Sequence, residues 1–463
     1  MVADVIVIGG GIGGLSVAYE LQRRGVASVV LEQADRAGGV ILSEEVDGFT
    51  IDAGPDSLLV QKPDGITLCE EVGLGSQLVP TKRPRLAYIQ RGGRLHALPA
   101  ASVLGIPTRV GPFMTTGLFS WAGKMRMAAE VFVPARRGDD DESIGAFMTR
   151  RFGKEATDYL AEPLLAGIHA GDVNRLSLGS LFPRFRDTER TQGSLLLAFR
   201  RQSQGAASRD GEGDGAFRSL PGGLSQMVRA VVASLSPGTL RLNAPVRRVS
   251  AGRYSHHVVV DVGGTPLEAR AVVFATPTYV TSVLVAELDA EIARRCDEIP
   301  YASTGTVVFG FRRSDVAHPL NGSGFVVPRV ENTGLLAASW MSSKWPNRAP
   351  DGRVLLRAFV GGARDHHALE QSDGALQNRA LAALTPLLGI SGDPLLARVY
   401  RWNRATAQHE VGHAARLAAI ERRLAARPGL FVTGSGWRGV GIPDCVADGR
   451  ATGAQVATYL QAV

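Results

Sequence analysis

Cysteine is scarce in this chain of 463 residues, which has only Cys69, Cys296 and Cys445. No C-x-x-C pair occurs, which argues against a disulfide framework or a structural zinc site, and we predict no bound metal. The sequence also lacks a run of about 18 apolar residues, the length that a transmembrane helix needs. No basic segment precedes the apolar N-terminus. We therefore expect no transmembrane helix, no secretory signal and a cytoplasmic location.

Blocks of basic residues are also missing, although the net charge is +7. Without such a block or a nucleic-acid motif, nucleic acid is the least favoured partner, and acidic small molecules or an anionic membrane surface are more consistent with the charge. Residues 110–133 combine Phe113, Trp121 and Met125 with Lys124. This stretch could contact a membrane and make the protein membrane-associated, but packing in the interior is the favoured interpretation.

Glycine, by contrast, is abundant, with 55 residues and no collagen-like period. From Asp4 the chain reads DVIVIGGGIGGLSVAYEL, which begins with a β-branched run typical of a buried parallel strand. The G-x-G-x-x-G pattern that follows permits a tight turn, a close approach of the backbone to a pyrophosphate, and close packing of the next helix, expected from Leu15 to Arg24. The residues predicted to bind a dinucleotide are Gly9, Gly10, Gly11, Ile12, Gly13 and Gly14.

A second strand, SVVLEQ, begins at Ser28 and ends in the acidic residue Glu32. The distance from the glycine motif is close to the spacing of about 20 residues at which an acidic side chain binds a ribose hydroxyl. The order of strand, glycines, helix, strand and acid is far more specific than the glycines alone. It predicts a dinucleotide with a free ribose hydroxyl.

The loop after Glu32 carries Arg36, Gly38 and Gly39 in the pattern R-x-G-G. Small residues there would let a second loop approach the dinucleotide, and Arg36 could offset phosphate charge. Because a simple NAD domain does not need this loop, the pattern resembles the FAD-dependent amine-oxidase superfamily, and FAD is the expected cofactor. Many members have arginine directly after these glycines, where this chain has Val40.

A second glycine-rich turn lies near the other end of the chain, in LFVTGSGWRGVGIPDC from residue 430. In that superfamily the FAD domain is discontinuous, so the resemblance implies that this turn returns to the first sheet and covers the flavin. The backbone N–H groups of Val440, Gly441 and Ile442 would then face the pyrimidine edge of the ring, and a helix from about Asp444 would aim its positive end there. We interpret Cys445 as a buried structural residue rather than a flavin attachment or redox thiol.

Several stretches narrow the resemblance to the oxygen-dependent porphyrinogen oxidases of haem synthesis. They are AGPDSLL, EPLLAGIHAGDVNRLSLGSLFPRF, SLPGGLSQMV, RWNRATAQHEVGHAARL and RGVGIPDC, in this order. VLGIPTRVGPFMTTGLFS and SSKWPNRAPDGRVLLRAFVG look most like the coproporphyrinogen III oxidases of Gram-positive bacteria. The resemblance implies noncovalent FAD, a porphyrinogen that loses six electrons in three two-electron steps, and O2 as the acceptor that becomes H2O2. Coproporphyrinogen III is the favoured substrate and protoporphyrinogen IX the alternative.

The resemblance also assigns roles to single residues. Those expected at the cofactor, besides the motifs above, are Gln33 at the ribose, Gly54, Pro55, Asp56 and Ser57 beside the flavin, Val246 at the adenine, and Trp402 at the flavin. Arg85 matches an arginine that pairs with a substrate propionate, and Gly167 matches a glycine above the substrate ring. His169 and His409 stand where relatives usually have aromatic residues. A titrating pocket is possible, but we favour imidazoles that fill this space and form local hydrogen bonds.

We expect a mixed α/β (α+β) fold with three parts. The first is a discontinuous Rossmann-like FAD-binding domain from residues 1–60, 210–280 and 405–463. The second is a sheet-based substrate domain from 61–105 and 285–405, and the third a helical domain from 106–205. Two other functions stay open, a flavin oxidase or desaturase for amines or carotenoids and a non-catalytic FAD-binding protein. The oligomeric state is also open.

Overall fold

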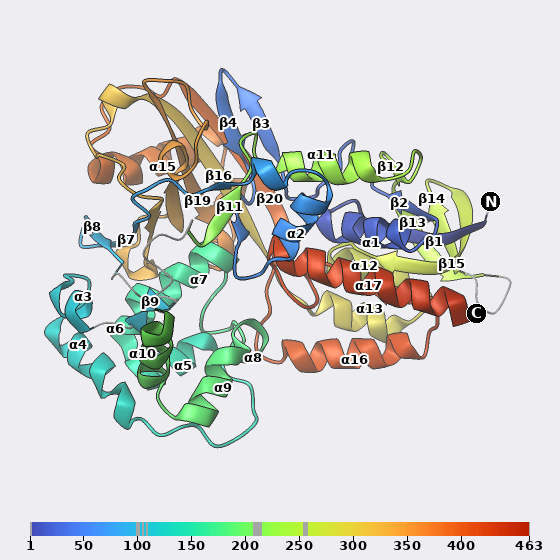
Figure 1. Cartoon of the computed structure of the whole chain (residues 1–463), viewed down its shortest axis with the longest axis horizontal. Coiled ribbons are helices and arrows are strands. Elements are labelled where there is room, and N and C mark those ends of the chain that lie inside the picture. The colour runs from blue at the N-terminus through green and yellow to red at the C-terminus, as the bar shows by residue number, and fades with distance from the viewer. Residues whose placement is uncertain are drawn as a thin grey trace.

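The computed structural model describes residues 2–98, 102–103, 106–107, 110–206, 215–252 and 258–462. These residues form two large sheets and a mainly helical region (Figure 1). The two ends of the chain lie near each other at the side of the molecule that carries the first sheet. The expected mixed α/β fold is confirmed. No helix in the described ranges is long and apolar enough to cross a membrane.

The first sheet has β1 in its interior, paired in parallel with β2 on one side and β15 on the other. Val5, Ile6 and Val7 are fully buried, as expected of a parallel strand covered on both faces. The strands, in spatial order, are β12 (Leu240–Arg241), β2 (Ser28–Leu31), β1 (Val2–Ile8), β15 (Thr265–Phe274), β14 (Val258–Val262) and β13 (Val246–Ala251), with β21 (Leu430–Val432) paired to β15.

Helices cover both faces of this sheet because successive side chains of β1 point to opposite faces. Val5 and Val7 pack into a core with α1 (Ile12–Arg23), α2 (Asp64–Glu71), α11 (Ser225–Ser234) and α17 (Ile442–Ala462). Ile6 and Ile8 pack into the other core with α12 (Thr278–Val285), α13 (Ala290–Asp297) and α16 (His413–Ala425). Helices α1 and α17, from opposite ends of the chain, therefore lie on the same face.

The second sheet is largely antiparallel, and α15 (Asp373–Leu388) covers one of its faces. Its strands, in spatial order, are β20 (Leu396–Ala407), β16 (Tyr301–Arg312), β19 (Arg353–Gly361), β18 (Ala337–Trp340), β17 (Gly324–Val326), β7 (Ala87–Arg91) and β8 (Arg94–Ala97). Its other face packs on the hairpin of β3 (Ser43–Val46) and β4 (Phe49–Asp52) through Phe49 and Val308. Helix α14 (Met341–Lys344) follows β18.

The third region is mainly helical and packs around its own apolar core. Its helices are α3 (Val110–Thr115), α4 (Trp121–Ala128), α5 (Ile144–Phe152), α6 (Lys154–Ala156), a π-helical turn at Thr157–Ala161, α7 (Glu162–His169), α8 (Leu178–Leu181), α9 (Pro183–Gln192) and α10 (Leu195–Ala206). Interior packing is confirmed for Phe113, which is buried. Interior packing is wrong for Trp121 and Met125, whose side chains are 67% and 68% exposed. Their spacing of four residues puts them together on the outer face of α4.

Short strands join the three regions. β5 (Leu58–Leu59), β11 (Phe217–Ser219) and β6 (Val79–Pro80) form a small sheet, and β9 (Ser102–Val103) pairs with β10 (Ile106–Pro107). Single helical turns lie at Gly75–Gln77, Ala129–Phe132, Arg313–Asp315, Arg329–Glu331, Gly362–Arg364 and Ala368–Glu370. The division into domains stays a prediction. Since α13 packs on the first sheet, the packing itself changes near Tyr301 rather than at residue 285.

Candidate functional site

The N-terminal turn leaves open space where a dinucleotide pyrophosphate would lie. Gly9 has φ +108°, and a Cβ there would lie 2.7 Å from the carbonyl oxygen of Ala275. A Cβ on Gly14 would overlap the carbonyl oxygen of Gly9. At Gly11, the N-cap of α1, a Cβ would meet nothing within 4 Å. Two glycines thus serve packing, and the third keeps clear a cradle that any larger side chain would fill.

The first turn of α1 is also chemically free to bind an anion. No side chain caps its N-terminus, and no acidic residue lies in its first turn. The backbone N–H groups of that turn therefore keep their partial positive charge for a ligand. Together with the open space at Gly11, this arrangement fits a pyrophosphate.

Glu32 directly follows β2 and lies beside this turn, as the spacing predicts. One carboxylate oxygen accepts the Gly10 N–H at 2.7 Å and the other accepts the Ala34 N–H at 2.8 Å. The N–H of Ala244 bonds the carbonyl of Glu32 at 2.9 Å, which brings the segment before Val246 to the same edge of the sheet. Gln33 is exposed at this edge. The predicted ribose and adenine residues thus converge, although their contacts with a nucleotide stay a prediction.

The R-x-G-G loop lies directly against the N-terminal turn. The Gly38 N–H bonds the carbonyl of Gly10 at 2.8 Å, and a Cβ on Gly39 would lie 3.5 Å from the Cα of Gly11. The Arg36 guanidinium donates to carbonyl oxygens of its own loop, including that of Gly39 at 2.6 Å. Arg36 therefore shapes the loop in this structure, and compensation of phosphate charge stays a prediction.

The segment Gly54–Ser57 follows β4 and packs behind that loop, since a Cβ on Gly54 would overlap the carbonyl oxygen of Val40. The Asp56 carboxylate is buried and accepts bonds from the Lys344 ammonium at 2.8 Å and the Trp345 indole N–H at 3.1 Å. Burial alone would raise the pKa of Asp56, but Lys344 and then Arg357 lower it well below its ordinary value. Asp56 is therefore a fixed anion in this segment.

Arg357 on β19 fastens the same segment to the second sheet. Its guanidinium donates to the carbonyl oxygens of Asp52 at 2.6 Å and Gly54 at 2.9 Å. It also lies 3.3 Å from the Asp56 carboxylate. Trp402 on β20 donates its indole N–H to the Ala53 carbonyl at 3.0 Å from the same side. We call Gly54–Ser57 the flavin-side segment, and it lies where the two sheets meet.

The C-terminal glycine-rich turn lies against the N-terminal one. β21 pairs in parallel with β15, and a Cβ on Gly13 would lie 3.5 Å from the Cα of Gly434. A Cβ on Gly449 in α17 would lie 2.5 Å from the carbonyl oxygen of Gly13 in α1. Helices α1 and α17 therefore lie in close contact, side by side in Figure 1, which brings the two turns together.

Helix α17 begins at Ile442, two residues before the expected start. Asp444 reaches back to accept the Gly441 N–H at 3.3 Å and forms an ion pair with Lys62 at 2.6 Å. This helix therefore carries a carboxylate in its own first turn, whereas the carboxylate beside the α1 turn, that of Glu32, follows β2. Cys445 is buried, and burial raises the pKa of its thiol to about 12, as expected of an unreactive structural cysteine.

The two candidate active-site residues lie apart in the chain but both near the second sheet. Arg85 follows β6 and donates its Nε–H to the Thr81 carbonyl at 3.1 Å. Gly167 is exposed in α7, and a Cβ there would lie 3.3 Å from Val326 of β17. His169 ends α7, where burial and then Lys62 lower its pKa to about 4. Their contacts with a substrate stay a prediction.

His409 is held by local hydrogen bonds, as the favoured interpretation expects. Its ring stacks on that of His413, with centroids 3.9 Å apart. The Nε2 atoms lie 3.0 and 2.9 Å from the carbonyl oxygens of Ser435 and Trp437, respectively. Since a carbonyl can only accept, both rings donate from Nε2. Burial and then His413 lower the pKa of His409 to about 3, so it is neutral at pH 7.

Sequence reasoning missed the residues that support the site from α16 and from the second sheet. These are His413, Lys344, Trp345, Arg348 and Arg357. One signal was present: Arg357 interrupts the apolar strand RVLLRAFVG, and a charged residue in a buried strand requires a partner. Nothing in the sequence identifies that partner as Asp56.

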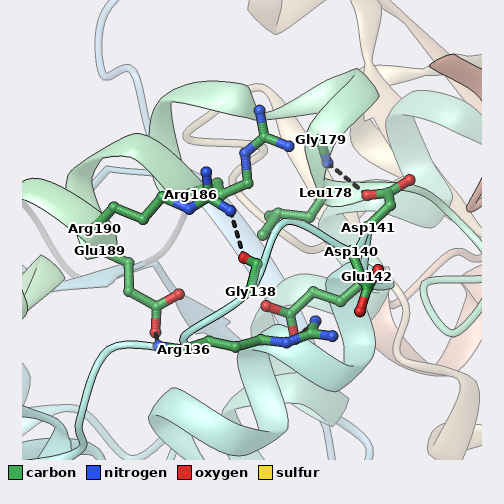
Figure 2. A pocket seen from close by; sticks show the side chains of 10 residues that line it. All are labelled: Arg136, Gly138, Asp140, Asp141, Glu142, Leu178, Gly179, Arg186, Glu189 and Arg190. Atoms are coloured by element: carbon green, nitrogen blue, oxygen red, sulfur yellow. Dashed lines mark hydrogen bonds and ion pairs between the residues drawn. The ribbon is translucent and has the colours of Figure 1, made fainter. Parts of the chain in front are cut away.

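A separate pocket lies in the helical region (Figure 2). It is lined mainly by charged side chains that pair with one another, such as Arg136 with Glu142 at 3.4 Å. None of the predicted site residues lines it. The candidate functional site is therefore the junction of the two glycine-rich turns with the second sheet.

Comparison with known proteins identifies relatives over the whole chain. Residues 12–457 match the model of the family described as flavin containing amine oxidoreductase. The chain is 35% identical to "Coproporphyrinogen III oxidase" of Bacillus subtilis, over 98% of each chain. It is 27% identical to "Protoporphyrinogen oxidase, mitochondrial" of Nicotiana tabacum, over 99% of this chain and 95% of that one.

Solved structures agree with the fold. A crystal structure from Exiguobacterium sp. 255-15 superposes with a TM-score of 0.87 at 30% identity, covering 98% of this chain and 99% of that one. Cyclohexylamine oxidase from Brevibacterium oxydans superposes with a TM-score of 0.71 at 17% identity, covering 99% of each chain. The second likeness shows the fold alone.

Proposed function

The chain belongs to the flavin containing amine oxidoreductase family, and we propose that it oxidises coproporphyrinogen III to coproporphyrin III with bound FAD. The observation that carries this proposal is the match, along nearly the whole chain, to coproporphyrinogen III oxidases of three bacteria. The junction of the two glycine-rich turns supports it, because it offers an open anion site at one end and flavin-side loops at the other.

The reaction removes six electrons from the porphyrinogen in three two-electron steps. Each step reduces one O2 to H2O2, so one porphyrinogen and three O2 give one porphyrin and three H2O2. FAD, when bound, supplies the two-electron acceptor between substrate and O2. The chain itself has to hold the cofactor, orient the macrocycle and exclude water. Among the residues that the structure describes, the site contains no convincing triad of nucleophile, base and orienting residue.

The residues near the flavin side act by positioning. Gly11 and the N-terminus of α1 would hold the pyrophosphate, and Glu32 would hold the ribose. Arg357 and Asp56 fix the flavin-side segment between the sheets. His409 is a neutral hydrogen-bond donor to the loop that would cover the ring. It is therefore a positioning residue and not a proton acceptor.

Protoporphyrinogen IX is the alternative substrate, favoured by the match to the tobacco enzyme. Coproporphyrinogen III has four propionates and protoporphyrinogen IX has two. A tetra-anion requires more cationic partners than a di-anion, because buried unpaired charge is costly. The proposal is tested by comparing kcat/KM for the two substrates by porphyrin fluorescence. We expect coproporphyrinogen III to be preferred, and a clear preference for protoporphyrinogen IX would overturn this choice.

Arg85→Ala tests the predicted propionate contact. If Arg85 binds a carboxylate equally in the ground and transition states, the variant should raise KM roughly 10-fold with little change in kcat. The fluorescence assay gives both constants. A variant with lowered kcat and unchanged KM would contradict this role. A yellow protein bleached by porphyrinogen without O2 would separate this function from a non-catalytic FAD-binding protein.

We also propose contact with an anionic membrane through an exposed apolar patch on the helical region, consisting of Met114, Trp121, Met125, Val131 and Phe132. Phe132 is 85% exposed, whereas Lys124 is buried, with its ammonium 4.7 Å from the Trp121 ring centroid and bonded to the Met114 carbonyl at 2.7 Å. An exposed aromatic and apolar surface on a chain of net charge +7 suits an anionic lipid interface. Cosedimentation with vesicles containing anionic lipid should fall in Trp121→Ser plus Phe132→Ser. Equal binding of both proteins would contradict the proposal.

A further inference from the structure

A buried group of charged side chains behind the flavin-side segment contains more cations than anions. Asp52 pairs with Arg348 at 2.9 Å, and Asp56 pairs with both Lys344 at 2.8 Å and Arg357 at 3.3 Å. Even with both carboxylates ionised, these ion pairs join three cations to two anions. An excess buried charge is costly unless a further partner compensates it. The group therefore suits an additional anion.

Lys344 is the cation of this group that reaches the surface. The side chains of Arg348 and Arg357 are 0% and 3% exposed, whereas that of Lys344 is 13% exposed. Both arginines also donate hydrogen bonds to backbone carbonyls. Arg348 donates to those of Pro221 and Leu220. An anion arriving from outside would therefore meet the Lys344 ammonium, which has three hydrogens to donate.

The start of β11 lies near both Lys344 and Arg85. Gly215, with φ +85°, precedes the strand by two residues, and Phe217 is its first residue. A Cβ on Gly215 would lie 2.8 Å from Nε of Arg85, and the Lys344 ammonium lies 5.8 Å from the Phe217 ring centroid. Both cations therefore lie at the segment from Gly215 to Phe217, with the half-exposed Phe217 ring next to Lys344.

We propose that Lys344 binds a carboxylate of the substrate and forms, together with Arg85, a two-point site for two carboxylates of one macrocycle. The inference rests on the proposed function for the identity of the substrate, a porphyrinogen with propionate arms. Phe217 offers an aromatic surface to the apolar ring system between such arms. Lys344 is here a specificity-determining residue, since it favours the substrate that carries more carboxylates.

The test compares Lys344→Gln, Lys344→Arg and the control Lys82→Gln in the holoenzyme. Lys82 is an exposed neighbour whose ammonium donates to the Ser342 carbonyl at 3.2 Å, so the control removes one equal charge nearby. We expect Lys344→Gln to raise KM for coproporphyrinogen III roughly 10-fold with kcat nearly unchanged, as expected for a lost charged hydrogen bond. Lys344→Arg and Lys82→Gln should stay near the wild-type KM.

A titration with the product, coproporphyrin III, gives a readout that does not require turnover. Its Kd should rise with KM in Lys344→Gln. A KM and Kd equal to those of Lys82→Gln would overturn the inference while leaving the proposed function intact. If the wild type oxidises neither porphyrinogen, the proposed function fails and the titration alone decides whether Lys344 binds carboxylates.

Flavin content separates substrate binding from support of Asp56. After Lys344→Gln, Asp56 still has Arg357 and the Trp345 indole as partners, so the flavin absorbance per polypeptide should be unchanged. Lys344→Met serves as a second variant of similar length. Loss of flavin in both variants would make Lys344 a positioning residue of the Asp56 segment and would overturn the inference.

Discussion

The two glycine-rich turns look alike in sequence but differ in the charge at the helix that follows each. Helix α1 begins without a side-chain cap and without an acidic residue in its first turn. Helix α17 begins with Asp444, which accepts the Gly441 N–H and pairs with Lys62. The first helix end is thus free to attract an anion, whereas the second already holds one.

This difference assigns different tasks to the two turns. A pyrophosphate carries full negative charges and is best held by an unoccupied helix end. A flavin ring edge is neutral in its oxidised state and requires shaped backbone more than charge. The second turn is accordingly held by side chains: His409 and His413 bind its carbonyls, and Asp448 accepts the Thr433 hydroxyl at 2.7 Å.

The largest effect is expected from Gly11→Val at the first turn. Gly11 has φ −69° and ψ 174°, a conformation that valine adopts readily, so the variant should fold. Its side chain would fill the space for the pyrophosphate, and FAD binding should be abolished. Flavin absorbance per polypeptide measures this. Gly374→Val in α15, where a Cβ also meets nothing within 4 Å, is the control and should keep its flavin. A yellow Gly11→Val protein would contradict the assignment of this turn.

A smaller effect is expected from acid, which should weaken the second turn. His409 stays neutral in the folded protein because its pKa is lowered to about 3, while the unfolded chain binds a proton below about pH 6.5. Stability present above pH 6.5 is therefore lost as the pH falls towards 3. As the pH falls from 6.5 to 5, the free energy of unfolding should decrease by about 2 kcal/mol because of His409.

Urea unfolding at several pH values measures this loss, with His409→Gln as the comparison. Glutamine can keep a donor near the Ser435 carbonyl but does not titrate. The variant should therefore lose less stability between pH 6.5 and 5 than the wild type does. Identical pH dependence in both proteins would show that His409 does not carry the effect.

The smallest effect is expected from Asp444→Asn, which makes the second helix end resemble the first. Asparagine keeps an oxygen for the Gly441 N–H but removes the negative charge. A reduced flavin is more negative than an oxidised one, so its potential should rise by about 20 mV for a helix-end effect of roughly 1 kcal/mol. Lys62→Gln leaves the carboxylate unpaired and should shift the potential the other way. A shift of the flavin potential in the same direction in Asp444→Asn and Lys62→Gln would contradict this explanation.

Much of the nucleotide half could be predicted from the sequence because its signals are local. Gly9, Gly14 and Glu32 lie within one βαβ unit, where fixed backbone geometry translates spacing into position. The same holds for the burial of Cys445 in a small-residue helix. The start of α17 was misplaced by two residues because Asp444 caps the helix from inside its first turn.

The contacts that complete the site were decided only by the tertiary structure. A Cβ on Gly13 would meet Gly434, and Arg357 binds the Gly54 carbonyl, across more than half of the chain. The sequence shows a charged residue in an apolar strand, but many carboxylates could balance it. Which one does so depends on how β19 packs behind the flavin-side segment, since buried charges pair with whatever the fold places within hydrogen-bond distance. Local sequence thus determined the cofactor class, and long-range packing decided which residues surround the cofactor.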